Sequence, residues 1–201
     1  KAGEVLEHCL HSAGLLRSEV HITNVVKVRP GLNSNDISPY FTGKRFTPLG
    51  MEWVQKLKEE LAALPANVIM PMGNTALSAL CDKVEITKWR GSLLESTILP
   101  GRKCIPTIHP AATLREGSQN SKKVVKYNPF FDRYLIADDL FKAKWHSEFP
   151  ELRLPQRNLI IRPEFEQAVE YIRKVRRGGI VSYDIETTNN QIDCLAVAPN
   201  K

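Results

Sequence analysis

The spacing of apolar positions changes several times along the chain, and each spacing indicates a different element. Over residues 2–15 the apolar positions recur at helical spacing and Gly14 supplies a C-terminal stop, so we predict a helix. Residues 19–28 form a continuous β-branched run, which predicts a strand covered on both faces. A loop rich in proline, glycine and asparagine follows over residues 29–43, and loops of this length usually carry function.

Strand and helix patterns continue to alternate after this loop. In chain order the sequence predicts a helix at 48–64, a strand at 67–73, a short helix at 74–81, a basic loop or strand start at 86–92, a strand at 103–108 and a long helix at 128–145. Such alternation predicts an α/β fold, a three-layer sandwich with a mainly parallel central sheet. The site is then expected at the carboxyl ends of the strands.

The pattern changes near residue 147, which divides the chain. We predict a first domain over 1–146, a proline-rich linker over 147–157 and the beginning of a second domain over 158–201. The second domain is expected to contain a strand, a helix and two further strands joined by a turn.

Composition narrows the function classes. The formal net charge is +6 and the pI is about 9.2, which favours an acidic partner such as nucleic acid. No apolar run approaches the roughly 18 residues of a membrane span, so no membrane partner is expected. The four cysteines are scattered without metal-ligand spacing, which favours reduced thiols and a cytoplasmic location.

Several polar residues follow the predicted strands. Asn24 is expected to end the first strand and His109 the third, and Leu114 and Arg115 lie in the next loop, so all four are expected at one sheet edge. Each residue also has a structural interpretation when taken singly. An asparagine at a strand end often caps a turn, and a lone histidine is as often structural as catalytic.

Four sequence blocks in a fixed order carry a family resemblance. Residues 22–30, 72–80, 86–92 and 106–115 resemble the uracil-DNA glycosylase superfamily, most of all its iron-sulfur bacterial branch, over about residues 2–145. The resemblance implies that the Asn24 amide binds the Watson-Crick edge of an extruded uracil. It also implies that the His109 imidazole donates to the uracil O2, where negative charge develops; one such donor is worth about 3 kcal/mol.

The resemblance also implies contacts with DNA. Leu114 would fill the gap left by the extruded nucleotide, and Arg115 would hold backbone phosphate. A further set of residues matches positions where the family grips phosphate: Gly73, Asn74, Lys88 and Arg90. For the two basic side chains an ordinary solvated face is an equal alternative.

Three departures from the family pattern bear on activity. The family's Gly/Pro-rich block, which carries its water-activating residue, would lie before Lys1. Val28 and residues 43–45 stand where iron-sulfur members have two cysteines, so no iron-sulfur cluster is expected. Ser34 stands where the family usually has arginine. Two hypotheses therefore remain open: the domain excises uracil, or it only binds or senses DNA.

The second domain offers a pair of carboxylates. Asp184 and Glu186 lie two residues apart in a predicted strand, so both face one side, as a pair of Mg²⁺ or Mn²⁺ ions requires. Surface acids are the alternative, because this spacing is common. The segment resembles the first motif of the ribonuclease H-like 3′-5′ proofreading exonucleases. It suggests a fragment of a phage or bacterial-type DNA polymerase, acting in replication or repair, with DNA and the remaining polymerase as partners.

Overall fold

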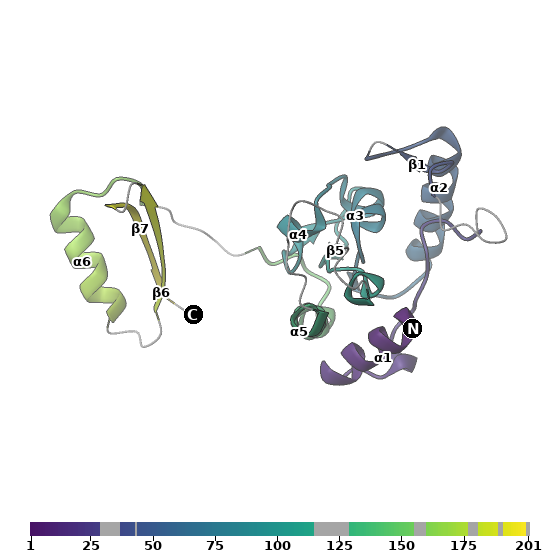
Figure 1. The fold of residues 1–201 in the computed structure, drawn as a ribbon, viewed down its shortest axis with the longest axis horizontal. Helices are drawn as coiled ribbons and strands as arrows, with labels where there is room; N and C mark the ends of the chain where they lie inside the picture. Colours follow the sequence, from purple (N-terminus) through teal and green to yellow (C-terminus); the bar gives the residue numbers. More distant parts are fainter. Residues whose placement is uncertain are drawn as a thin grey trace. The chain divides into compact units, whose positions relative to one another are not determined.

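The computed structural model describes residues 1–28, 37–42, 44–114, 129–154, 160–176, 181–188 and 191–199. The chain divides into two compact units, Lys1–Leu154 and Pro155–Lys201. Figure 1 shows the elements of both units. None of the helices in the described ranges has the length and apolarity that a membrane crossing needs.

The first unit is a mixed α/β structure with small sheets. Its helices, including two 3₁₀ turns, are α1 (Ala2–Ser12), η1 (Arg17–Glu19), α2 (Pro48–Ala62), α3 (Asn74–Cys81), α4 (Ile86–Trp89), η2 (Pro110–Leu114) and α5 (Pro129–Ser147). Its strands are β1 (Phe41–Thr42), β2 (Arg45–Phe46), β3 (Val68–Ile69), β4 (Leu94–Glu95) and β5 (Lys103–Cys104). The predicted helices α1, α2, α3 and α5 are confirmed, whereas the basic segment 86–92 begins as a short helix rather than a loop or strand.

The central sheet has the order β3-β5-β4. β3 pairs with β5 in parallel, and a parallel bridge between Met72 and Thr107 continues this pairing beyond the two strands. β4 pairs with β5 antiparallel. Among the described residues the sheet is therefore mixed rather than mainly parallel, because the unpredicted strand β4 runs back along β5.

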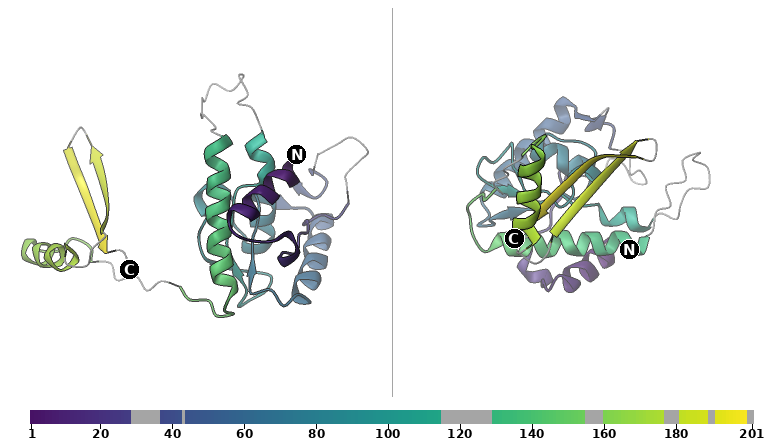
Figure 2. Two further views of the ribbon diagram at one scale, coloured as in Figure 1. Left: turned by 90° about the horizontal axis from the view of Figure 1, so that it is seen from below. Right: turned by 90° about the vertical axis from the view of Figure 1, so that its left-hand side faces the viewer.

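Helices cover both faces of this sheet. Met70 and Met72 pack against one cluster of buried residues, whereas Ile69 packs against another, as expected for alternating strand positions. The first cluster comes mainly from α1 and α5, which lie side by side in Figure 2. The second comes mainly from α2 and α3. The sheet is thus enclosed between two helical layers.

The strand predicted over residues 19–28 is wrong. Its first residue belongs to η1, and residues 20–28 belong to no strand. The side chains of the segment anchor it instead, since Val20 packs against the first cluster and Val25 against the second. The β-branched composition of the segment thus serves packing between layers rather than strand pairing.

A buried lysine fixes the end of the first unit. Lys103 on β5 is fully buried, and its Nζ donates to the carbonyl of His146 at 2.5 Å and to that of Phe149. The ammonium also lies 3.9 Å from the centre of the Phe149 ring. These contacts tie the chain after α5 to the sheet, so the residues up to Leu154 belong to the first unit, although the sequence predicts a linker from residue 147.

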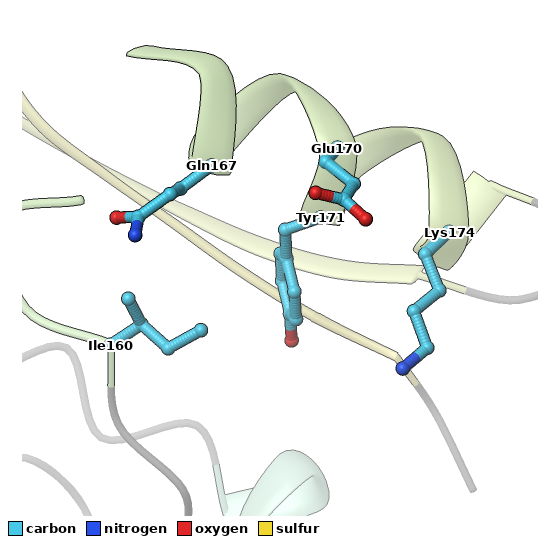
Figure 3. Close-up of a pocket in the computed structure, with 5 residues that line it drawn as sticks. All are labelled: Ile160, Gln167, Glu170, Tyr171 and Lys174. Atoms are coloured by element: carbon cyan, nitrogen blue, oxygen red, sulfur yellow. The ribbon is translucent and has the colours of Figure 1, made fainter. Parts of the chain in front are cut away.

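The second unit contains a helix and a hairpin. α6 (Phe165–Arg176) packs against β7 (Gln191–Pro199), which pairs antiparallel with β6 (Val181–Thr188). Figure 3 shows a hollow of this unit lined by Ile160 and by four α6 residues: Gln167, Glu170, Tyr171 and Lys174. The helix and the hairpin match the predicted order, but residues 160–162 of the strand predicted at 158–162 are not in a strand, and residues 158–159 lie outside the described ranges. These elements do not define a ribonuclease H-like fold, which stays a prediction.

Candidate functional site

His109 lies where the chain leaves the central sheet. It lies two residues after Thr107, whose bridge with Met72 continues the pairing of β3 and β5, it directly precedes η2, and it is exposed. The His109 Nδ1 accepts a hydrogen bond from the Ala111 N–H at 3.1 Å. A neutral imidazole that accepts at Nδ1 carries its proton on Nε2. The turn after the strand therefore sets the tautomer in which Nε2 is the donor.

Gly73 lies against His109. The Gly73 N–H donates to the Thr107 carbonyl at 3.0 Å, which joins the exits of β3 and β5. A Cβ at Gly73 would lie 3.1 Å from the His109 Cβ, and the Gly73 φ of +87° is one that other residues rarely adopt. The structure thus brings together two of the predicted site residues at the carboxyl edge of the parallel pair.

Asn24 is exposed on a segment that is anchored at the surface of α2. The His21 Nε2 lies 2.9 Å from the Glu60 Oε1, and Lys27 donates to the other oxygen of the same carboxylate. The hydrogen bond from Lys27, and then that from His21, lowers the pKa of Glu60 to about 2. Glu60 therefore binds residues on both sides of Asn24 and holds this segment on α2.

The predicted phosphate contacts Asn74 and Lys88 lie in neighbouring helices. The Asn74 Oδ1 accepts from the Ile86 N–H at 2.8 Å, which joins the beginnings of α3 and α4. Lys88 is exposed and forms an ion pair with Glu85 at 2.5 Å, which lowers the pKa of that carboxyl. The Asn74 side chain thus has a structural partner, whereas the Lys88 ammonium lies at the surface.

Arg90 points inward. Its Nη2 donates to the Asp139 Oδ1 at 2.8 Å and its Nε donates to Oδ2 at 3.2 Å. Nη2 also lies 3.2 Å from the Leu135 carbonyl on α5. Arg90 does not lie on a solvated face, which was the structural alternative for this residue. Its side chain is only 25% exposed and forms an ion pair with a buried carboxylate. Its predicted contact with phosphate stays a prediction.

The sequence prediction missed Thr107 and Asp139. Thr107 is fully buried and its hydroxyl donates to the Asp139 Oδ2 at 2.7 Å. Burial raises the pKa of Asp139, and the hydrogen bonds from Thr107 and Arg90 oppose that rise. The sequence contained a signal for the burial of Asp139. This residue lies on the same helical face of α5 as the buried Ile136 and Ala143.

The predicted wedge loop begins in η2. The Thr113 hydroxyl donates to the Pro110 carbonyl at 2.9 Å and so closes this turn. Leu114 follows with 41% of its surface exposed, a high value for a leucine. Arg115 lies outside the described residues.

The carboxylates of the second unit lie on β6. Asp184 and Glu186 are both exposed, and they pair across the hairpin with Ala196 and Cys194. Their spacing places both on one face of the strand, as predicted. Within the described ranges no group of three His, Cys, Asp or Glu residues could hold a metal ion, and the metal site at Asp184 and Glu186 stays a prediction.

The first unit matches a known family. The family model described as the uracil DNA glycosylase superfamily matches residues 1–132. The chain therefore belongs to this superfamily. The type-4 uracil-DNA glycosylase of Thermotoga maritima is 36% identical over 127 residues, which cover 62% of this chain and 60% of that protein. The chain thus spans about three fifths of the length of this curated relative.

The described thiols of the first unit lie in two separate places. Cys9 is buried in the cluster of α1 and α5, whereas Cys81 and Cys104 are buried in the other cluster. Cys194 belongs to β7 of the second unit. An iron-sulfur cluster needs four thiolates around one centre. Val28, at a position where the iron-sulfur branch has cysteine, is an exposed apolar residue.

Proposed function

We propose that the first unit binds uracil-containing DNA and excises the uracil by hydrolysis of its N-glycosidic bond. Membership of the uracil DNA glycosylase superfamily supports this proposal. The observation that carries it is the hydrogen bond from the Ala111 N–H to the His109 Nδ1, which leaves Nε2 as the donor. The three-layer architecture predicted for this family agrees with helices on both faces of the sheet.

The proposed chemistry uses His109 as an electrostatic group. Water adds to C1′ of the deoxyribose, the bond from C1′ to the base breaks, and the base leaves as an anion that then takes up a proton. The Nε2–H of a neutral His109 donates to the uracil O2 as this charge develops. The Asn24 amide offers both a donor and an acceptor, so it can pair with the O4 and N3–H of uracil and reject cytosine.

The proposed DNA contacts come from residues near or after the strand exits in the sequence. Leu114 fills the space left by the extruded nucleotide, and Arg115 holds phosphate beside it. Lys88 offers an exposed ammonium for another phosphate. Gly73 shapes the turn before α3, and Asn74 offers its backbone N–H at the start of this helix, a position that suits an anion. The net charge of +6 favours the same partner.

We propose that this unit acts without an iron-sulfur cluster, because its thiols are divided between two buried clusters. The alternative function is uracil recognition without excision. Val28 stands where the iron-sulfur branch has a cysteine, and this departure from the family pattern favours the alternative only indirectly. The two functions predict the same DNA contacts, but only excision releases free uracil.

The test is a uracil-release assay on single- and double-stranded DNA with the full natural protein. We expect His109→Ala to slow release by about 100-fold or more, as loss of such a donor does elsewhere. His11→Ala, which removes an exposed histidine of α1, is the matched control. Binding that prefers uracil to thymine without release supports recognition alone. Absence of both release and preference contradicts the proposal.

The second unit carries a separate hypothesis. Asp184 and Glu186 on β6 would hold Mg²⁺ or Mn²⁺ together with ligands from outside the described residues, as in a 3′-5′ exonuclease. The polymerase context of the whole protein rests on this same pair. Metal-dependent release of 3′ nucleotides that is lost in Asp184→Asn tests the hypothesis.

A further inference from the structure

We propose that Asp139 is a positioning residue for His109, and that it acts through Thr107 and the turn at Arg90 and Gly91. The proposal rests on the function of His109 as a donor to the leaving base. It concerns the geometry of the strand exit, whereas Asp139 itself is buried and makes no contact with substrate in this scheme.

The first link is Thr107, two residues before His109. Every polar group of Thr107 is engaged, since its N–H donates to the Pro71 carbonyl at 2.9 Å and its carbonyl accepts from Gly73 at 3.0 Å. Its hydroxyl donates to Asp139 at 2.7 Å. The first two bonds fix Thr107 relative to the exit of β3. The third fixes it relative to α5.

The second link runs through Gly91. The Gly91 N–H donates to the Pro106 carbonyl at 2.8 Å, so the turn after α4 is joined to the residue before Thr107. A Cβ at Gly91 would lie 2.8 Å from the Asp139 Oδ1, so the backbone of this turn packs directly on the carboxylate. Arg90 holds the same carboxylate through two hydrogen bonds.

The carboxylate therefore joins three segments at one point. It receives hydrogen bonds from β5 and from the turn after α4, while it is itself part of α5. An apolar residue of similar size would cost less to bury than a charge, but it would not specify these distances. The network thus favours one orientation of the segment that carries His109.

A small displacement of this segment has a direct effect on His109. The imidazole orientation depends on the contact with Gly73 and on the bond from the Ala111 N–H to Nδ1. If the exit of β5 shifts, that bond lengthens and the Nδ1–H tautomer becomes populated. The donor is then lost from Nε2 in part of the molecules, and a misplaced group of this kind can cost about 100-fold in rate.

The experiment compares Thr107→Val, which removes the hydroxyl at constant shape, with Thr107→Ser, which retains it. Two properties are measured: the tautomer of His109 by ¹⁵N NMR, assigned with His109→Gln, and single-turnover uracil release at saturating protein. Thr97→Val, a threonine between β4 and β5, is the matched control. Asp139→Asn is measured in the same way.

We expect Thr107→Val and Asp139→Asn to raise the Nδ1–H population and to slow release about tenfold or more, with a Kd for DNA within about twofold of the natural protein. Thr107→Ser is expected to restore both properties. A purely structural role would lower Tm and leave the tautomer and the rate of the folded protein unchanged.

Wild-type spectra and rates in folded Thr107→Val and Asp139→Asn overturn the proposal. If Asp139→Asn does not fold, Thr107→Val decides alone, because threonine and valine have the same branched shape and differ by one methyl in place of the hydroxyl. If the natural protein releases no uracil, the proposed function fails but the tautomer measurement still decides on positioning. The two failures are therefore distinguishable.

Discussion

His109 and Asn24 are both exposed, yet the segments that carry them are held in opposite ways. The His109 segment is fixed from inside the molecule by Thr107 and by Asp139, whose side chain is only 4% exposed. The Asn24 segment packs through Val20 and Val25, but its charged contact is at the surface with Glu60, whose side chain is 29% exposed. A buried network sets geometry more firmly than a surface ion pair, because water and salt do not compete for its partners.

The difference predicts how each segment reacts to loss of its carboxylate. Asp139→Ala leaves the Arg90 guanidinium and the Thr107 hydroxyl without their acceptor in a buried site. We expect a loss of about 3 kcal/mol in the free energy of unfolding, measured with urea. Asp138→Ala, which changes the exposed neighbouring residue of α5, is the control. Equal losses for the two variants would contradict the buried network.

A second prediction concerns the contact between Gly73 and His109. Gly73 and Gly101 both have a φ that favours glycine, +87° and +83°, so alanine is strained at either position, and the ψ of 176° at Gly73 is one that other residues rarely combine with such a φ. Only Gly73 has a neighbour, since a Cβ there would lie 3.1 Å from His109, whereas a Cβ at Gly101 would meet nothing within 4 Å.

We therefore expect Gly73→Ala to destabilise the protein by about 1 kcal/mol more than Gly101→Ala, the cost of a forced contact in a packed site. It should also slow uracil release, which Gly101→Ala should not change. Thermal and urea unfolding of both variants give the first comparison, and single-turnover assays give the second. Identical behaviour of the two variants would show that the contact does not constrain His109.

The sequence predicted the helices, in which a regular spacing of apolar residues extends over several positions. α1, α2, α3 and α5 were expected because each repeats apolar positions over several residues. β4 was not expected, because its two residues lie in no longer apolar run, whereas β3 and β5, which are equally short, lie in the apolar runs at 67–73 and 103–108. The segment 20–28 has the composition of a strand, but its side chains pack against the two hydrophobic clusters or contact Glu60. These tertiary contacts outweigh the strand propensity of the segment.

Part of the geometry around His109 follows from the predicted strands. The sequence predicts one strand that ends at Gly73 and another that ends at His109, and in the structure these two residues lie against each other. The role of Asp139 was not predictable, because its partners Thr107 and Arg90 lie 32 and 49 residues away. A buried acid on the core face of a helix indicates a partner but does not say which one.

The smallest expected effect concerns the surface anchor of Asn24. Because Lys27 and His21 lower the pKa of Glu60 to about 2, the folded protein keeps this carboxylate ionised at pH values where the unfolded chain binds a proton. Its contribution to stability is therefore present above the ordinary pKa of glutamate and is lost as the pH falls to about 2.

We expect Glu60→Gln to be less stable than the natural protein by only about 0.5 kcal/mol at pH 7, since the pair is solvent-exposed. The difference should shrink between about pH 5 and pH 2, and 1 M salt should reduce it at pH 7. Urea unfolding across this pH range measures it, with Glu59→Gln on the exposed face of α2 as the control. If the difference in unfolding free energy depends on neither pH nor salt, Glu60 holds the Asn24 segment by packing. The contrast with Asp139 would then disappear.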